Sequence, residues 1–584
     1  MKKVLLLAFC AAAMLTVQAQ PTVTNSWTKS QTDILSVANV NNSNPVAVSA
    51  QGDMYATGLF TESFTFGGKE MEAITTSSYL LKYGVDGAEK WGVALTGAAT
   101  IKAITTDDAG NIYIAGNFAD VLVFGSTDGK TQEKEGMKIG DAPVPEQVAG
   151  FVAKYDVNGV LKAVQSFIPK VLPELETNEG YVPETSALYF NINNLAFSDG
   201  KLYASALFTG LTEVNTFSFK GNYLDVFGLG LSFSDLASGA IFTMDNDGLN
   251  VNGIVANMAV NGAQTELQMA VHSASFAISG DKLYSGFVAN GSQILTIGSQ
   301  STNFEFLIPD NGNMEYGYVL SVIDLSTGTS SLTEKYIAAH DILPNSSNIK
   351  SMIVKDNVLL LGGTFNKQLP FDENKSAVST NDIYVVGLNT STLAVNWSAT
   401  SAFDESGNGE NKNKNEIFSG MTVVGDYAYA IGYSSDISTS AVSAVDNSLT
   451  LWVDITNGTK HQTTQANPAN LATGVAASGT KLAIAQTQIA DQKLENIFSL
   501  NEVSNATGIS STEQGAGVSV YPNPVVDVLN FTTPCDVVII NLMGVTVKQA
   551  ENVSSLPVSD LISGQYIIKL TTEDGTSTVK VIKK

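Results

Sequence analysis

Short runs of β-branched and aromatic residues, broken every few positions by Gly, Asn and Asp, make up most of the chain after its first twenty residues. Helical periodicity is almost absent, and runs of this kind are typical of β-strands joined by tight turns. Pairs such as Asp86-Gly87 and Asn158-Gly159 favour hairpins, because tight hairpin turns need residues with positive φ. The pattern predicts an all-β protein.

One unit recurs along the chain: an apolar strand, a Gly/Asp/Asn turn, a second strand usually centred on Tyr, and then a further hairpin. Seven copies can be followed, of which the first four carry Tyr55, Tyr113, Tyr203 and Tyr284. Four strands in each of seven units predict a β-propeller of about seven blades, with a tandem series of β-sandwiches as the competing architecture. We expect the repeated Tyr residues to pack between blades, with a sugar-stacking role as the alternative.

The unit resembles the bacterial β-propeller repeat family. The segment Gly110-Asn111-Ile112-Tyr113-Ile114-Ala115-Gly116 and the later hairpin Phe151–Gly159 carry the resemblance, which is good in the first two copies and degenerate afterwards. The resemblance implies the propeller fold more firmly than an exact number of blades.

Three tryptophans predict how the ring closes. Trp91 and Trp397 begin the strand after the second hairpin, which would be the outermost strand of a blade. Trp27 has the same surroundings but precedes the first repeat, so we expect Ser26 to about Gln31 to join the last blade, built from about residues 471–509. Such a clasp removes an open sheet edge, and deletion of residues 20–40 should lower the melting temperature.

The repeats are longer than plain four-stranded blades, so several carry insertions. The most conspicuous are about residues 126–149, 168–186 and 404–416. Insertions on a rigid scaffold are common binding sites, and passive surface loops are the equal alternative.

The first residues are typical of a secretory signal. Lys2 and Lys3 precede an apolar run, and cleavage is expected between Ala19 and Gln20. The run is too short for a membrane-spanning helix, and no later stretch is apolar enough, so we predict no transmembrane segment in the mature chain. The predicted organisation is a signal peptide at 1–19, a propeller-like repeat domain at 20–505, a linker at 506–517 and a C-terminal module at 518–584.

The C-terminal module is predicted to be a small Ig-like β-sandwich. It carries an ordered set of motif residues: Tyr521, Pro522, Asn523, Pro524, Asp527, Leu529, Gly544, Gly564, Tyr566 and Lys583. With these residues it closely resembles the C-terminal sorting domain of the type IX secretion system, found in the Bacteroidetes. That resemblance implies export across the inner and outer membranes, with the secretion machinery and a surface sortase as partners. It also implies cleavage within the linker, and a destination at the cell surface, attached there to lipopolysaccharide, or outside the cell.

Composition excludes one class of partner. The chain has 56 acidic and 31 basic residues, a formal charge of −25, and every basic residue is Lys. An acidic surface repels phosphate backbones, and without Arg there is no bidentate guanidinium fork, so nucleic-acid binding is not expected. The charge should keep a large β-surface soluble, and it disfavours adhesion to anionic lipids.

The search for chemistry gives no catalytic, cofactor or metal residues. The three His are far apart in sequence, and no zinc spacing, nucleophile elbow or phosphate loop is present. The run Asp245–Gly248 fits a turn better than a calcium loop, which leaves weak calcium binding as an open alternative. We therefore favour a non-enzymatic binding propeller for a glycan or protein. The alternatives are a secreted polysaccharide hydrolase with carboxylates in the funnel and a structural surface-layer component.

Overall fold

Strands make up the architecture of the described part of the chain in a computed structural model. The structure describes residues 21–32, 45–73, 76–136, 138–139, 142–143, 148–170, 188–221, 237–260, 270–306, 313–341, 347–377, 381–401, 414–436, 445–465, 470–490, 493–504, 518–541, 546–562, 564–572 and 575–584. Within these residues every regular element is a strand, which confirms the all-β prediction. Val23–Val503 form one compact unit, and the strands from Val520 onward belong to a second.

The first unit contains seven antiparallel sheets, each built on four strands that follow one another from the innermost to the outermost position. The first four blades are β2 (Val46–Val48), β3 (Met54–Phe60), β6 (Ser77–Tyr83) and β7 (Glu89–Thr96); β8 (Ala99–Thr106), β9 (Ile112–Phe118), β14 (Ala149–Tyr155) and β15 (Leu161–Phe167); β17 (Phe190–Ser198), β18 (Lys201–Phe208), β21 (Ser238–Asp245) and β22 (Val251–Val260); and β23 (Val271–Ser279), β24 (Lys282–Ala289), β27 (Asn313–Asp324) and β28 (Thr329–Asp341).

Two further blades repeat this order, and the seventh takes its outermost strand from the N-terminal part of the chain. They are β29 (Ser351–Lys355), β30 (Val358–Phe365), β33 (Asp382–Asn389) and β34 (Val395–Thr400); β35 (Lys414–Val424), β36 (Tyr427–Asp436), β37 (Val445–Asp454) and β38 (Lys460–Gln465); and β39 (Asn470–Ser478), β40 (Lys481–Ala490), β41 (Lys493–Ser504) and β1 (Thr22–Thr32).

The innermost strands form a closed ring. Each contacts the innermost strand of the next blade, from β2 through β8, β17, β23, β29, β35 and β39, and β39 lies against β2 again. Sequential four-stranded blades around such a ring define a β-propeller. The structure therefore confirms a propeller of seven blades.

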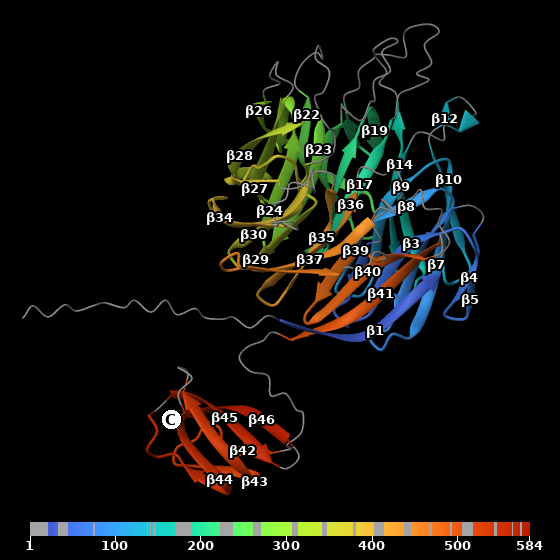
Figure 1. The fold of residues 1–584 in the computed structure, drawn as a ribbon. Coiled ribbons are helices and arrows are strands. Elements are labelled where there is room, and N and C mark those ends of the chain that lie inside the picture. The colour runs from blue at the N-terminus through green and yellow to red at the C-terminus, as the bar shows by residue number, and fades with distance from the viewer. Residues whose placement is uncertain are drawn as a thin grey trace, which may run out of the picture. The chain divides into compact units, whose positions relative to one another are not determined.

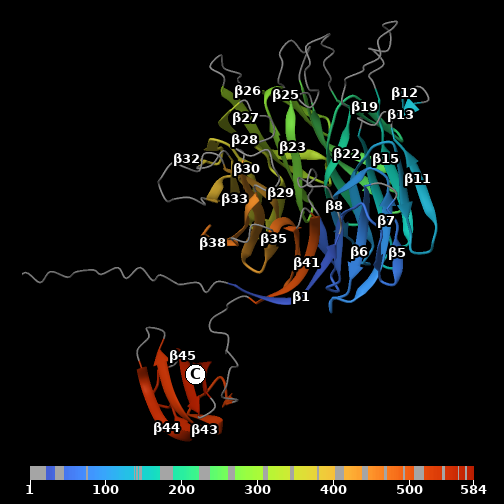
Figure 2. The same cartoon turned by 45° about the vertical axis from the view of Figure 1, so that its right-hand side comes forward.

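The predicted clasp is present. β1 pairs with β41, and both figures show the blue strand beside its orange-red partner (Figures 1 and 2). Asn25 Nδ2 also donates to Asn501 Oδ1 at 3.1 Å across this pair. The observed strand covers residues 22–32, somewhat more than the residues 26–31 expected from the sequence, and it covers the edge that β41 would otherwise expose.

A repeated contact, which we term the indole latch, ties outer strands to the next blade. An outer-strand Trp Nε1 donates to a backbone carbonyl in the turn between the third and fourth strands of the following blade. That turn contains a glycine with positive φ on which the ring lies. The latches are Trp27 to Val85 O (3.0 Å) over Gly87, Trp91 to Val157 O (3.0 Å) over Gly159, and Trp397 to Ile455 O (2.8 Å) over Gly458.

Packing between blades follows the predicted Tyr positions. Tyr55 and Tyr113 are fully buried, and Tyr203 and Tyr284 retain only 4% exposure, each on the second strand of its blade. Hydrophobic clusters combine residues of neighbouring blades; one joins Tyr55 of the first blade with Ile112 of the second. The Tyr residues are therefore packing residues.

Two insertions extend blades with additional strands, so one detail of the prediction was wrong. β10 (Val121–Gly125) pairs with β7 and is followed by β11 (Thr131–Glu135), so the strand that carries Trp91 is not the edge of its sheet. In the third blade, β25 (Gly291–Ile297) and β26 (Gln300–Phe306) are added beyond β22. Each hairpin pairs with the outer strand of a blade and completes its ladder hydrogen bonds. The alternation of residues in an insertion does not show whether the segment forms such a hairpin or a loop.

Much of the predicted insertions lies outside the described residues, including 171–187 and 402–413. Short strands are also present beside the main strands of the blades. The remaining small strands are β4 (Phe64–Phe66), β5 (Lys69–Met71), β12 (Lys138–Ile139), β13 (Ala142–Pro143), β16 (Pro169–Lys170), β19 (Leu211–Val214), β20 (Phe217–Lys220), β31 (Gln368–Leu369) and β32 (Asp372–Ser376).

The second unit is a connected ladder in the order β42-β43-β45-β46, with β44 also paired to β43. Its core includes Leu529, Val537 and Ile568, and the free cysteine Cys535 is buried there. This arrangement is compatible with the predicted small sandwich, and its Ig-like topology stays a prediction. The strands are β42 (Val520–Tyr521), β43 (Val528–Asn541), β44 (Thr546–Pro557), β45 (Gly564–Thr572) and β46 (Gly575–Lys583).

Candidate functional site

The predicted sorting motif is built around the last strand of the chain. Tyr521 ends β42, and the Pro522-Asn523-Pro524 segment then turns toward β46. Asn523 Oδ1 accepts a hydrogen bond from the backbone N–H of Ile582 at 3.0 Å. Val525 continues this pairing, since its N–H donates to Ile582 O at 2.8 Å and its carbonyl accepts from the Lys584 N–H at 2.9 Å. Two parts of the motif that are sixty residues apart therefore form one clasp.

The remaining motif residues hold the same module together. The Asp527 carbonyl accepts from the Val558 N–H at 2.7 Å, and Leu529 is buried in the core with 1% exposure. Gly564 begins β45, and Tyr566 Oη donates to Ile562 O at 2.7 Å. Lys583 lies in β46 and is buried (9% exposed). Gly544 and the expected cleavage residues Ala19 and Gln20 lie outside the described residues, and the functional assignment of all these positions stays a prediction.

Large apolar side chains are exposed around this clasp. Ile562 is 82% exposed and Tyr521 53% exposed, although both are residues that a small domain would normally bury in part. The sequence did not reveal this surface, because alternation in a short strand does not say which face a partner strand will cover. The exposed apolar side chains of the module are Tyr521, Val526, Val528, Val547, Ile562 and Ile582.

A groove lies on the outer side of the propeller, where the added hairpin of the third blade meets the outermost strand of the fourth. Its volume is about 500 Å³, and apolar Leu295, Ile297 and Leu332 share its wall with side chains that carry hydroxyl or amide groups. The Ser330 N–H donates to Gln300 Oε1 at 3.1 Å and so joins the two blades across it. Its remaining lining residues are Ser301, Thr302, Ser331 and Thr333.

The groove has no charged residue among its lining residues. Its hydroxyl and amide groups can donate hydrogen bonds to a neutral polar ligand and accept hydrogen bonds from it. A groove of a few hundred Å³ with apolar walls and some polar groups is typical of small-ligand sites. Sequence reasoning missed these residues because β25 and β26 lie between repeats, and their Ser, Thr and Gln residues have no distinctive spacing.

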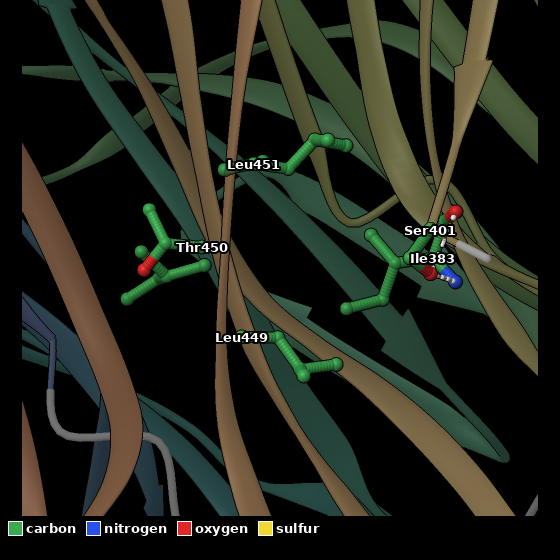
Figure 3. A pocket seen from close by; sticks show the side chains of 7 residues that line it. Ile383, Ser401, Leu449, Thr450 and Leu451 are labelled. Atoms are coloured by element: carbon green, nitrogen blue, oxygen red, sulfur yellow. Dashed lines mark hydrogen bonds between the residues drawn. The ribbon is translucent and has the colours of Figure 1, made fainter. Parts of the chain in front are cut away.

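A second cavity lies between the fifth and sixth blades and is a packing void. Its volume is about 10 Å³, room for about one water molecule, and Figure 3 shows Ile383, Leu449 and Leu451 around it. The Ile383 N–H donates to Ser401 Oγ at 2.9 Å, and Ser401 Oγ donates in turn to the carboxylate of buried Glu416.

The innermost strands were the expected location of a carboxylate pair if the protein is a hydrolase. Glu416 is the one acidic residue on these seven strands within the described part of the chain, and it is bound to Ser401. No residues are thus assigned to that alternative, which stays a prediction.

The Asp245–Gly248 run forms a turn. Asp245 Oδ1 accepts from the Gly248 N–H at 2.7 Å and Oδ2 from Asn250 Nδ2 at 2.9 Å. These hydrogen bonds lower the pKa of the Asp245 carboxyl against the opposing effect of burial, which is the larger single influence. Among the described residues no group of three or more His, Cys, Asp or Glu side chains is arranged to hold a metal, and weak calcium binding stays a prediction.

Comparison with protein families identifies the C-terminal module. Residues 519–584 match the family described as the secretion system C-terminal sorting domain. A search for membrane spans found, in the residues the structure describes, no helix long and apolar enough to cross a bilayer.

Comparison of the remaining chain gives distant relatives. An uncharacterised WD repeat-containing protein of Acanthamoeba polyphaga mimivirus is 32% identical over 143 residues, which are 22% of this chain and a tenth of that relative's length (10%). The β-propeller domain of Cps50 (Swd1) from Myceliophteria thermophila is 10% identical, with a TM-score of 0.37, and covers 83% of this chain and 100% of its own.

Virginiamycin B lyase from Staphylococcus aureus is similar at the same level: 10% identity, a TM-score of 0.30, and coverage of 81% of this chain and 99% of its own. At these TM-scores the fold assignment rests on the strand order and the closed ring described above. The chain therefore consists of a seven-bladed β-propeller followed by a type IX secretion system C-terminal sorting domain.

Proposed function

We propose that this protein is exported by the type IX secretion system to the cell surface or the extracellular space, where its propeller binds a glycan or a protein without chemical turnover. The sorting-domain match to residues 519–584 is the observation that carries the export part of the proposal. The predicted signal peptide supplies the first step, passage across the inner membrane, and the sorting domain the second, passage across the outer membrane.

The exposed apolar residues of the sorting module support contact with the export machinery. Tyr521, Val526, Val528 and Ile582 lie on or beside the clasp between the motif and the last strand. A water-exposed apolar surface of this kind stabilises a complex when a partner covers it. A surface sortase would then cut within residues 506–517, and the released propeller would be attached to anionic lipopolysaccharide or set free.

The outer groove supports the binding part of the proposal. Its neutral hydroxyl and amide groups beside Leu295, Ile297 and Leu332 suit an uncharged sugar, which presents both hydroxyls and apolar C–H faces. We favour a glycan over a protein ligand for this groove, because a groove of about 500 Å³ takes a few sugar residues and is small for a protein interface.

Two measurements test the proposal separately. Deletion of residues 519–584 should keep the protein inside a type IX-competent host, whereas the full chain should be found outside; equal export of both would contradict the route. A glycan array probed with the full chain should give hits that Thr302→Trp weakens by blocking the groove. A matched Thr65→Trp change on exposed β4 should have no effect, and an array without hits would contradict glycan binding.

A further inference from the structure

Most of the innermost strands share an irregularity in register, which leaves one residue of the strand without a partner in the ladder. In the second blade Ile101 pairs with Gly116 and Ala103 with Ala115, so Lys102 is an extra, bulged residue. Equivalent register shifts leave Asn193, His272, Ser419 and Thr473 as the extra residues of the third, fourth, sixth and seventh blades, and the His272 ring is bound to Asn290 within its own blade. A β-bulge redirects its side chain, and here it recurs at one level of the ring.

Lys350 occupies the same position in the fifth blade. Ser351 pairs with Gly362, and the Lys350 N–H also donates to Gly362 O at 2.9 Å, so two residues face one. Lys350 Nζ donates to Phe418 O at 3.2 Å, and Phe418 directly precedes the bulged Ser419 of the next blade. The ammonium group therefore lies at the level of the bulges.

The neighbours of Lys102 indicate the direction of its side chain. Ile101 packs in the cluster between the first and second blades and Ala103 in the cluster between the second and third, so the residues on either side of Lys102 occupy both interfaces of the blade. β8 is the innermost strand of its sheet, so the remaining direction is the axis of the ring. Blades two and five lie on opposite sides of a seven-membered ring, and two long side chains can approach each other across it.

The electrostatics agree with this geometry. Desolvation and, second to it, the positive charge of Lys102 together lower the pKa of the Lys350 amine to about 8, although the Lys350 side chain keeps contact with solvent. Burial likewise lowers the pKa of the Lys102 amine. Two amines of like charge destabilise each other unless an anion lies between them. No carboxylate within the described residues forms an ion pair with either amine at 4.0 Å or less.

We propose that Lys102 and Lys350 form an oxyanion-binding site in the central channel of the propeller. Its ligand is a phosphate, sulfate or carboxylate group, either as a free ion or carried by a sugar. The ammonium groups supply charge-assisted hydrogen bonds, and Asn193, Ser419 and Thr473 lie at matching bulges from which an amide and two hydroxyl groups can complete the donor set. This site is separate from the outer groove and does not depend on the proposed function.

Amine labelling with peptide mapping by mass spectrometry tests this on the full chain. At pH 8 and constant ionic strength, inorganic phosphate or sulfate should slow acylation of Lys350 at least fivefold in a saturable manner. In Lys102→Gln the half-protecting concentration should rise about tenfold, the effect of losing one charge-assisted hydrogen bond in a desolvated site. Lys130→Gln, at an exposed turn lysine, is the matched control and should change nothing.

Further measurements distinguish a free oxyanion from an anionic sugar, and anion binding from a purely structural role of Lys350. Protection by glucuronate as well as by phosphate assigns an anionic sugar, whereas protection by the inorganic ions only assigns a free oxyanion. The Lys350→Gln variant should melt no lower than the unmodified chain without anion, because it removes like-charge repulsion, and phosphate should no longer raise its melting temperature. No protection by any anion, or equal half-protecting concentrations in Lys102→Gln and Lys130→Gln, would overturn the site.

Discussion

The indole latch at Trp27 should hold the propeller ring closed. The indole is 9% exposed, its Nε1 donates to Val85 O at 3.0 Å, and its ring centroid lies 5.3 Å from that of Tyr83. These contacts join the N-terminal strand β1 of the seventh blade to the first blade. We therefore expect Trp27→Ala to destabilise the whole propeller and not only its N-terminal strand.

The cost can be worked from this geometry. A buried aromatic side chain removes about 150–250 Å² from water, and at about 25 cal/mol per Å² this gives an upper bound of roughly 4–6 kcal/mol. Measured Trp→Ala losses are about 3–5 kcal/mol, since neighbours relax in part. Val23–Val503 comprise about 480 residues, so an unfolding entropy of about 2 cal/mol/K per residue converts 4 kcal/mol into a fall of about 4 °C in Tm.

The glycine under the ring supplies a matched comparison. Gly87 has φ of 77° and Gly129 has φ of 82°, and each follows Asp in a tight turn. Alanine at either position costs about 1–2 kcal/mol for the left-handed backbone. Only at Gly87 would the added Cβ lie 2.8 Å from Trp27 Cγ, whereas around Gly129 there is open space. Gly87→Ala should therefore lower Tm more than Gly129→Ala.

Thermal melts of the full chain followed by far-UV circular dichroism measure these shifts. In a Trp27→Ala background the collision is gone, so the two alanine substitutions should then cost the same, and the double-mutant cycle gives the coupling. A Tm of Trp27→Ala within about 1 °C of the unmodified chain would refute the latch as a closing contact. Equal effects of Gly87→Ala and Gly129→Ala in the unmodified background would refute the packing argument.

Three further perturbations test other parts of the structure. Burial lowers the pKa of His272 to about 4. As the pH falls from 6.5 to 4 the unfolded chain therefore takes up the proton before the folded chain, so the free energy of unfolding should drop by up to about 3 kcal/mol. Urea unfolding of His272→Gln should show that much less pH dependence over the same range. Asn523→Ala removes the acceptor for the Ile582 N–H and should speed hydrogen exchange of that amide severalfold; unchanged exchange would count against the clasp. Gly116→Ala would place a Cβ against Thr100 O and should cost about 1–3 kcal/mol in a denaturant melt, and a neutral result would contradict the close approach of β8 and β9.

Much of the propeller could be predicted from the sequence, because the same local strand and turn pattern occurs in every repeat. The Tyr-centred strand and the Trp27 resemblance to Trp91 predicted the blades and the clasp, which the pairing of β1 with β41 confirms. The type IX resemblance was confirmed over residues 519–584. In the second unit β43 runs through Pro534, where its pairing with β44 is interrupted between Asn530 and Cys535, so the missing N–H of the proline breaks no ladder bond to β44.

The candidate sites could not be predicted in the same way. Lys102 and Lys350 are unremarkable in the sequence, because a bulge is a mismatch between two paired strands and leaves no mark in the alternation of one. The groove likewise depends on the contact between the β25–β26 hairpin and β28, which are separated by more than twenty residues and belong to different blades. The spacing of residues within one strand does not show that Lys102 and Lys350 lie near each other, or that the β25–β26 hairpin contacts β28.

The placement of positive charge explains how an acidic, Arg-free chain can offer an anion site. Lys82 and Lys154 are buried at 6% and 8% exposure, where their ammonium groups donate to Val157 O and Asn246 O in the turns of the following blades. Such lysines serve the contacts between blades, and Lys82 is also paired with Asp53 at 2.9 Å, while the chain as a whole carries a formal charge of −25. A free anion is therefore repelled outside and attracted only within the channel. Added neutral salt should screen both effects, so it should speed anion entry while weakening equilibrium binding, whereas a surface site of ordinary lysines would be slowed and weakened together.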